Sequence, residues 1–304
     1  MTQIITNYLR PLPFLTGLLV SLILIQPVSA NTVKSVSAAS SVANKTTQSP
    51  LTVLQSKLVQ GGFLIGQVKA GTQVEFLDRN LVVNSQRQFI IGFGRDFPDT
   101  ATLKLTHSNT TESVQFNIRK RQWKIERIDG LPPSKVNPKS AAVLKRIAED
   151  VREIKKGRAM ESSLNYFLHP FIYPAKGRIS GVYGSQRVLN GEPKRPHYGQ
   201  DIAAPVGTPV IAPLSGIVRV AHPDMFYSGA TVILDHGHGL TSTYLHLDKI
   251  HVTVGQEIKQ GELMATIGQS GRATGPHLDW RINWHNQRLD PALFIDDTLE
   301  KAAN

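Results

Sequence analysis

The residues with the clearest chemical potential are His197 and Asp201, four positions apart in the segment His-Tyr-Gly-Gln-Asp. Imidazole nitrogen and carboxylate oxygen are both common zinc ligands, so the pair is a candidate half of a zinc site. A histidine and an aspartate in a surface loop are an equal alternative on spacing alone. A metal site therefore requires a third ligand and a proton carrier from elsewhere in the chain.

The C-terminal half supplies candidates for both. Seven of the ten histidines lie between His197 and His251 or at His277, which is the pattern that a metal or acid–base site would produce. From residue 167 to 296, short runs of strand length alternate with Gly or Pro turns. This pattern predicts a mainly β domain, because the segments between the strand-like runs leave no room for the helices of βαβ units.

Several segments of the second half match a known family in the same order along the chain. They are Gly184–Arg187, Pro196–Val210, Val232–Gly237, Tyr244–Leu247, Val254–Gln256, Ile267–Gly271 and Thr274–Leu278. Together they resemble the lysostaphin-type (LytM-like) peptidoglycan zinc metallopeptidase family. The resemblance implies a compact antiparallel β fold with Zn²⁺ in a long groove, and hydrolysis of peptide crosslinks in bacterial cell walls.

The resemblance also implies roles for individual residues. His197 and Asp201 match the first two zinc ligands. His246 and His277 match two unligated catalytic histidines, which orient the attacking water and stabilise the transition state. Three protein ligands leave an open position for the water in a catalytic zinc site. Two further residues in the matching segments are assigned to substrate binding: Arg187 and Tyr244.

The sequence departs from the family at the third ligand. The family has His-x-His near its end, and this chain has His277-Leu278-Asp279. Asp279 is either a replacement ligand, since carboxylate oxygen is a normal zinc donor, or the mark of a degenerate site. On a strand Arg281 would share a face with Asp279, where it could offset the added charge or hold Asp279 away from zinc by a salt bridge. Because the other expected site residues are unchanged, we predict an active enzyme.

The N-terminus predicts export. Residues 11–27 are mostly apolar, follow Arg10 and precede Val28-Ser29-Ala30, which is the layout of a signal peptide at 1–30 with cleavage after Ala30. An uncleaved anchor is the alternative, but the apolar core is short for a span of about twenty residues. We therefore expect a periplasmic or secreted protein without a stable membrane span after cleavage.

Composition narrows the classes of partner. The net charge is +11, from 34 Lys and Arg against 23 Asp and Glu, which favours an anionic partner. Export counts against nucleic acid, whereas an anionic cell-envelope polymer fits. The chain has no cysteine, which excludes disulfides, cysteine zinc sites and a lipid anchor on cysteine.

The remaining segments complete a two-domain prediction. Residues 31–50 are small and hydroxylated, typical of a flexible linker. Short strands and turns over 51–130 predict a small sandwich-like β module that serves as a spacer or docking module. Helical spacing of Val143, Leu144, Ile147, Val151 and Ile154 predicts a connecting helix over 139–160.

The sequence thus predicts a zinc endopeptidase acting on the stem-peptide crosslinks of peptidoglycan. The long N-terminal β module differs from a simple wall-targeting repeat and favours a Gram-negative periplasm. In that compartment the family resemblance implies a bond between D-amino acids. Other envelope hydrolases or an activator are additional predicted partners. The alternative is a catalytically degenerate module that binds peptidoglycan or activates an amidase.

Overall fold

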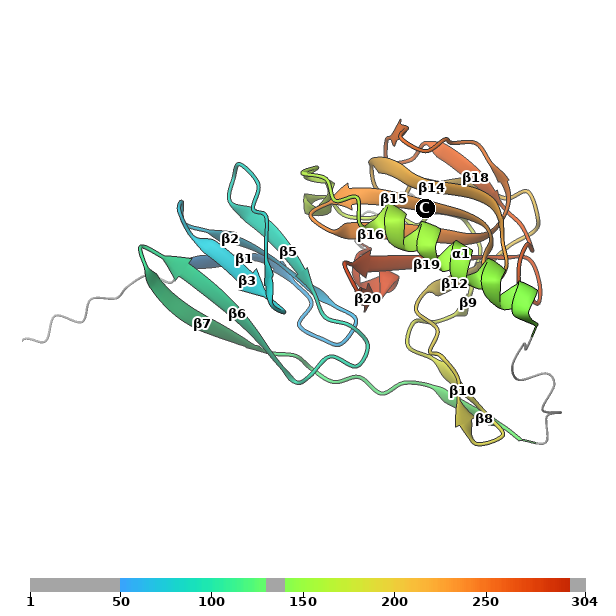
Figure 1. The fold of residues 1–304 in the computed structure, drawn as a ribbon, viewed down its shortest axis with the longest axis horizontal. Helices are drawn as coiled ribbons and strands as arrows, with labels where there is room; N and C mark the ends of the chain where they lie inside the picture. Colours follow the sequence, from blue (N-terminus) through green and yellow to red (C-terminus); the bar gives the residue numbers. More distant parts are fainter. Residues whose placement is uncertain (1–49, 130–139, 296–304) are drawn as a thin grey trace, which may run out of the picture. The chain divides into compact units, whose positions relative to one another are not determined.

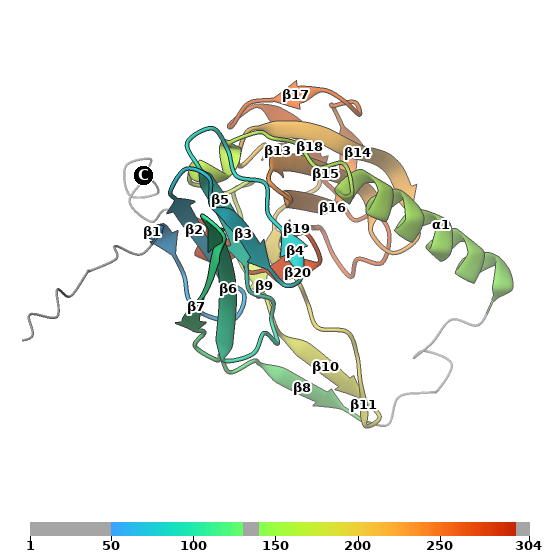
Figure 2. The same ribbon diagram turned by 60° about the vertical axis from the view of Figure 1, so that its left-hand side comes forward.

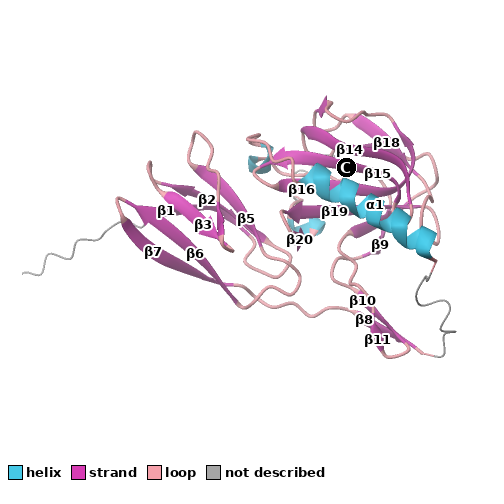
Figure 3. Ribbon diagram, in the orientation of Figure 1, coloured by secondary structure: helices cyan, strands magenta, loops and turns pink. Residues whose placement is uncertain are grey.

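The computed structural model describes residues 50–129 and 140–295. The predicted signal peptide and nearly all of the predicted linker lie outside the described residues. The described chain is mainly β, as predicted, and Figure 3 shows how little of it is helical. Among the described residues, no helix combines the length and the apolar composition needed to cross a membrane.

The N-terminal segment forms two small antiparallel sheets, with the strand orders β1-β2-β5 and β4-β3-β6-β7 (Figure 1). The strands are β1 (Leu51–Ser56), β2 (Phe63–Val68), β3 (Gln73–Phe76), β4 (Arg79–Asn80), β5 (Gln88–Gly92), β6 (Thr100–His107) and β7 (Thr110–Asn117). In β6 every second side chain is buried: Ala101, Leu103 and Leu105. This alternation is what a strand with one face on a core requires.

The C-terminal segment is built on one large antiparallel sheet of order β17-β14-β15-β16-β19-β12-β9, which β13, β18 and β20 extend (Figures 1 and 2). Its strands are β9 (Arg178–Gly181), β12 (Gln200–Ala203), β13 (Pro209–Ile211), β14 (Gly216–Met225), β15 (Gly229–Gly237), β16 (Leu240–Ile250), β17 (Glu257–Ile258), β18 (Leu263–Ile267), β19 (His277–Trp284) and β20 (Gln287–Leu289). Two short 3-10 helices are η2 (Tyr166–Leu168) and η3 (Pro291–Leu293). β19 lies between β16 and β12, so the three strands that carry the predicted site are neighbours.

Strand β8 (Ile125–Ile128) crosses between the predicted domains. The sequence pattern placed this run in the N-terminal module, but it pairs in parallel with β10 (Gln186–Leu189), which also pairs with β11 (Glu192–Pro193). Figure 2 shows β8 beside β10. A short apolar run carries no local signal of its partner strand, since strand pairing is made between residues distant in the sequence.

Buried apolar side chains of the two segments form one continuous core. Phe76 packs on Trp284 with ring centroids 5.7 Å apart, and Phe63 stacks on Phe294 at 4.2 Å. The described residues accordingly form one compact unit. The two predicted modules are therefore distinct in their sheets but not in their core, because large aromatic side chains from each fill space in the other.

Helix α1 (Ala141–Arg158) lies on one face of the large sheet, against β14 and β15. Ile154 packs on the buried side chain of Val220, and Gly157 approaches that side chain so closely that a Cβ would overlap it. Leu144 and Val151 are 51% and 43% exposed, so the predicted apolar stripe is not buried at these positions. The apolar contacts of the helix therefore lie in the half that ends at Arg158, whereas Arg146 donates to Asp224 and Asp150 accepts from the Phe226 N–H.

A buried histidine makes the folded state sensitive to acid. The His236 ring nitrogens lie 2.8 Å from the Ser215 carbonyl oxygen and 2.7 Å from the Ser242 hydroxyl, and burial lowers the pKa of His236 to about 4. Because an unfolded histidine has a pKa of about 6.5, the unfolded state takes up the proton first and stability is lost as the pH falls through 6.5 toward 4. The loss is about 3–4 kcal/mol, from roughly 2.5 pH units at about 1.4 kcal/mol each.

We therefore expect the urea midpoint of unfolding to fall between pH 7 and pH 4.5. A His236→Gln variant should show a flatter dependence, since glutamine does not titrate. Equal pH dependence in the variant and the wild type would show that His236 is not responsible.

Candidate functional site

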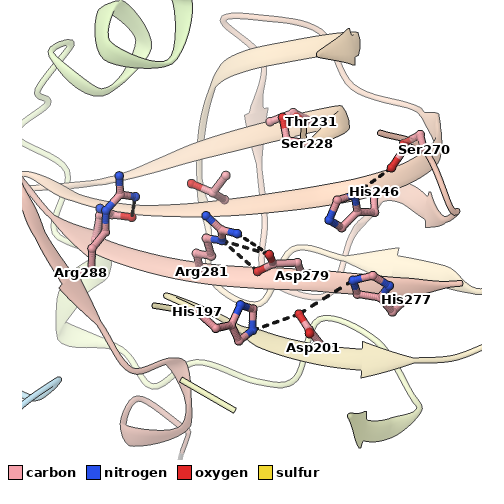
Figure 4. Close-up of polar contacts among 12 residues, drawn as sticks. His197, Asp201, Ser228, Thr231, His246, Ser270, His277, Asp279, Arg281 and Arg288 are labelled. Carbon is pink, nitrogen blue, oxygen red and sulfur yellow. Dashed lines mark hydrogen bonds and ion pairs between the residues drawn. The ribbon is translucent and has the colours of Figure 1, made fainter. Parts of the chain in front are cut away.

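Five predicted site residues lie together on one face of the large sheet (Figure 4). β12 carries Asp201 and begins just after His197, β19 carries His277 and Asp279, and β16 carries His246. In the register of β12 and β19, Asp201 is directly opposite Asp279. Strands distant in sequence thus bring the two halves of the predicted site together.

The side chains of His197, Asp201 and Asp279 form a candidate metal-binding group. One donor atom of each lies within 4.8 Å of the others. His197 Nε2 is 3.1 Å from Asp201 Oδ1, and neither of these buried atoms has another hydrogen-bond partner. Buried polar atoms left unpaired are costly, and a cation between them would satisfy both. One imidazole and two carboxylates suit zinc, so the residues present fit the ion that the sequence predicts.

Two glycines leave room for the carboxylates of this group. A Cβ on Gly199 would overlap an Asp279 carboxylate oxygen, and a Cβ on Gly181 would overlap one of Asp201. Sequence reasoning missed both glycines. The available signal was a glycine within or beside a strand, which marks a close approach of another group.

We expect Gly199→Ala to lower zinc affinity about tenfold to a hundredfold, as displacing a group that supports a ligand typically does. The reason is that the added methyl group pushes the Asp279 carboxylate out of the group. Zinc competition with a chromogenic chelator measures this. Gly275→Ala is the control, because a Cβ there has no neighbour within 4 Å. Equal zinc affinity in the two variants would contradict the argument.

Arg281 pairs with Asp279 through two guanidinium nitrogens. Arg281 Nε lies 2.9 and 3.1 Å from the two carboxylate oxygens, and Nη2 lies 2.5 Å from Oδ2. Burial alone would raise the pKa of Asp279, but Arg281 lowers that pKa to about 2. Asp279 is thus held ionised, with an oxygen still within reach of the other donor atoms. The pairing anticipated in the sequence is present, and it is compatible with either role considered for Arg281.

The electrostatics of His197 follow from the same carboxylates. Burial lowers its pKa, but the neighbouring charges of Asp201 and Asp279 raise it further, so the net shift is upward. A cation between these groups would take the place of that proton.

His246 and His277 each contact a backbone carbonyl oxygen through Nδ1. His246 Nδ1 lies 2.8 Å from the Ser270 carbonyl oxygen, and His277 Nδ1 lies 2.8 Å from that of Gly275. A carbonyl only accepts, so each Nδ1 carries the hydrogen and Nε2 is the acceptor of a neutral ring. His277 Nε2 lies 4.0 Å from Asp201 Oδ1 of the metal-binding group. The ring centroids are 4.8 Å apart. Burial lowers the pKa of His246, which keeps that ring neutral at pH 7.

The backbone at His246 is unusual. Its φ is 62°, a left-handed conformation that is uncommon outside glycine and concentrates at functional sites. Here the pairing of β15 with β16 shifts by one residue, because Ala230 and Val232 are opposite Leu247 and Tyr244. This bulge turns the His246 side chain toward the metal-binding group.

Residues 195–291 match the model of peptidase family M23. The chain carries a peptidase M23 domain. The match contains the candidate ligands His197, Asp201 and Asp279 and both histidines of the pair, and it agrees with the family resemblance of the sequence.

Named relatives match a part of the chain. The chain is similar to "Peptidoglycan DD-endopeptidase ShyA" of Vibrio cholerae, with 40% identity over 116 residues, or 36% of this chain and 26% of that protein. It is also similar to "DD-carboxypeptidase/endopeptidase Mpg" of Neisseria meningitidis, with 31% identity over 144 residues, or 47% of this chain and 32% of that protein. The match thus spans about a quarter to a third of these relatives' own length.

The likeness to a solved structure extends beyond the M23 domain. A candidate peptidase M23 from Pseudomonas aeruginosa has 27% identity and a TM-score of 0.60, covering 79% of this chain and 95% of that one. The fold of the longer described region is therefore shared with a second protein of this kind.

The two residues assigned to substrate binding lie elsewhere. Tyr244 has no exposed surface, and its hydroxyl lies 2.6 Å from that of Ser242, so the expected substrate contact is wrong for Tyr244. The bulge at His246 breaks the strand alternation, which leaves Tyr244 on the core face of the M23 domain. Arg187 is exposed on β10, with Nε 3.1 Å from Glu126 of β8, and its role stays a prediction.

Proposed function

We propose that the chain is an exported zinc-dependent endopeptidase that hydrolyses peptide crosslinks of bacterial peptidoglycan. The observation that carries the proposal is the group of His197, Asp201 and Asp279, whose donor atoms converge within 4.8 Å, beside His246 and His277, whose Nδ1 atoms are fixed by carbonyl oxygens. The names of the relatives support peptidoglycan as substrate and a bond between D-amino acids. The predicted signal peptide supports a periplasmic location, where other envelope hydrolases or an activator are proposed partners.

His197, Asp201 and Asp279 would hold the zinc ion. When bound, zinc supplies a Lewis acid and lowers the pKa of a water molecule. Arg281 keeps Asp279 ionised and fixes the plane of its carboxylate through two nitrogens. The charge that aspartate brings in place of histidine is thereby balanced by a neighbouring guanidinium.

His246 is positioned to move the proton. Its Nδ1–H is fixed on the Ser270 carbonyl, so Nε2 accepts the proton of the attacking water and returns it to the leaving amine. His277 stabilises the oxyanion when its Nε2 carries a proton. The His277 ring lies 4.8 Å away and adds to the effect of burial in lowering the pKa of His246.

Digestion of purified sacculi tests the proposal. We expect the wild type to release soluble muropeptides, a chelator to stop the release, and added zinc to restore it. His246→Ala should release almost nothing. Wild-type protein that holds zinc and releases no muropeptide from sacculi would contradict the proposal.

One observation favours a second function. The bidentate hold of Arg281 on Asp279 is also what a degenerate site would show, in a module that binds the wall or activates an amidase. In that case purified protein would contain no zinc under replete conditions, and Asp279→His would digest sacculi where the wild type does not.

A further inference from the structure

A second group of charged side chains lies on the same face of the sheet as the metal-binding group. We call Arg158, Arg281 and Arg288 the arginine cluster. Arg158, the last residue of α1, donates from Nη2 to the Thr243 hydroxyl at 2.8 Å. Thr243 of β16 lies opposite Arg281 of β19, so the end of the helix contacts the strand next to the one that carries Asp279.

Arg288 joins the cluster from β20. It lies opposite Asn283 of β19 and donates from Nη1 to the Asn283 side-chain oxygen at 3.2 Å. Figure 4 shows Arg281 between Arg288, which comes from β20, and Asp279, which shares β19 with Arg281. Asn283 is in turn opposite Thr241, two residues from Thr243, so Arg158 and Arg288 approach one face from neighbouring strands.

The charges of Arg158 and Arg288 are not compensated. Arg281 is paired with Asp279, but the contacts found for the other two within the described ranges are with neutral groups. Arg158 Nε is buried without any hydrogen-bond partner. Burial and the neighbouring arginines lower the pKa of both guanidinium groups, that of Arg288 to about 10.

A structural role does not account for these charges. The hydrogen bond to the neutral Thr243 hydroxyl leaves the charge of Arg158 unpaired, close to the charges of Arg281 and Arg288. Both Arg158 and Arg288 are half-buried. Charge taken partly out of water without a partner costs free energy, and such costs concentrate where a ligand completes the site.

Guanidinium groups match carboxylates in shape as well as charge, since two parallel N–H groups face two oxygens. We propose that Arg158 and Arg288 bind a free carboxylate of the peptide substrate, beside the metal-binding group. This rests on the proposed function, which supplies the peptide.

The strand geometry sets the distance. Arg281 and Asn283 lie two and four residues along β19 from Asp279, or about 7 and 14 Å at about 3.4 Å per residue. An extended peptide has nearly the same rise, so the carboxylate lies roughly two to four residues from the cleaved bond. The preferred substrate is thus an anionic peptide with a carboxylate at that spacing.

The test uses two crosslinked peptides, one with free carboxylates and one with the same carboxylates amidated. Full-length wild type, Arg158→Gln and Arg288→Gln are compared by KM and kcat. We expect the wild type to prefer the free carboxylate by about tenfold to a hundredfold in kcat/KM, the range for hydrogen bonds to charged groups. Each glutamine variant should lose most of that preference through a higher KM. Arg152→Gln is the matched control, because Arg152 is exposed on the same helix.

Two outcomes would overturn the proposal: equal kcat/KM of the wild type for both peptides, or variants whose kcat/KM falls equally for both peptides. Thermal unfolding excludes a folding defect, since Arg158→Gln should melt no lower than the wild type. Calorimetric titration of non-cleaving His246→Ala protein with both peptides separates this proposal from the proposed function. If binding prefers the free carboxylate and depends on Arg158 while the wild type cleaves neither peptide, that result would support the carboxylate subsite and reject only the proposed hydrolysis.

Discussion

Asp279→Ala is expected to abolish zinc retention and, with it, hydrolysis. The variant removes one of three candidate ligands and leaves the Arg281 guanidinium without its carboxylate. Breaking a buried ion pair from one side costs about 3–5 kcal/mol, so a large loss of stability is expected as well. Metal analysis of the purified protein and chemical unfolding measure the two effects separately.

A double variant distinguishes ligation from folding. Asp279→Ala combined with Arg281→Met removes both charges and replaces them with apolar groups, so most of the lost stability should return. Zinc should remain absent, because the third ligand is still missing. Stoichiometric zinc in either variant would show that Asp279 is not a ligand and would leave the pair with Arg281 as a purely structural contact.

The second large effect is expected at His246. His246→Asn should lower kcat by about a hundredfold to ten-thousandfold, the usual contribution of a positioned proton carrier, while zinc content stays at one ion per chain. Asparagine is chosen because it tolerates the left-handed backbone found at this position, where φ is 62°. Kinetics on a soluble crosslinked peptide, with metal analysis in parallel, measure both quantities.

His238→Asn is the matched control. His238 is also a histidine with a left-handed backbone, at φ 52°, but its ring nitrogen contacts the Val82 carbonyl oxygen at 2.9 Å, away from the metal-binding group. Its kcat should stay within about threefold of the wild type, as expected for a residue outside the chemistry. Equal losses in the two variants would indicate that the effect at His246 comes from the backbone rather than from proton transfer.

Much of the candidate site could be predicted because its members fall within local motifs. His197 and Asp201 share one short segment. His277, Asp279 and Arg281 occupy every second position of one strand. Strand periodicity is a local property, so it correctly predicted that Arg281 would face Asp279. The structure adds that the pairing is bidentate.

Tyr244 shows where periodicity fails. Tyr244 and His246 are two positions apart, and regular alternation would place both side chains on the site face. The bulge between them changes the face, and its cause is the mismatch of β15 against β16, which no local pattern in β16 reveals. The pairing of β8 with β10 was missed for a related reason, since the partner strand lies some sixty residues away in the chain.

Arg158 lies outside any motif of the site. In the sequence it ends a charged helix, and nothing in the helical spacing distinguishes it from other exposed basic residues such as Arg152. Only the docking of α1 through Gly157 and Ile154 brings Arg158 to β16, the strand next to the one that carries Asp279. Long-range packing decides its role.

The continuous core has a consequence for how this protein can change through evolution. Peptidase M23 similarity is recognised over residues 195–291, yet Trp284 within that range is covered by Phe76. A gene fragment that encoded the matched range alone would leave that indole bare and would omit β8 and the arginine from α1. The unit that recombination can transfer intact is therefore larger than the unit that sequence similarity detects. The N-terminal and C-terminal segments are expected to be inherited together.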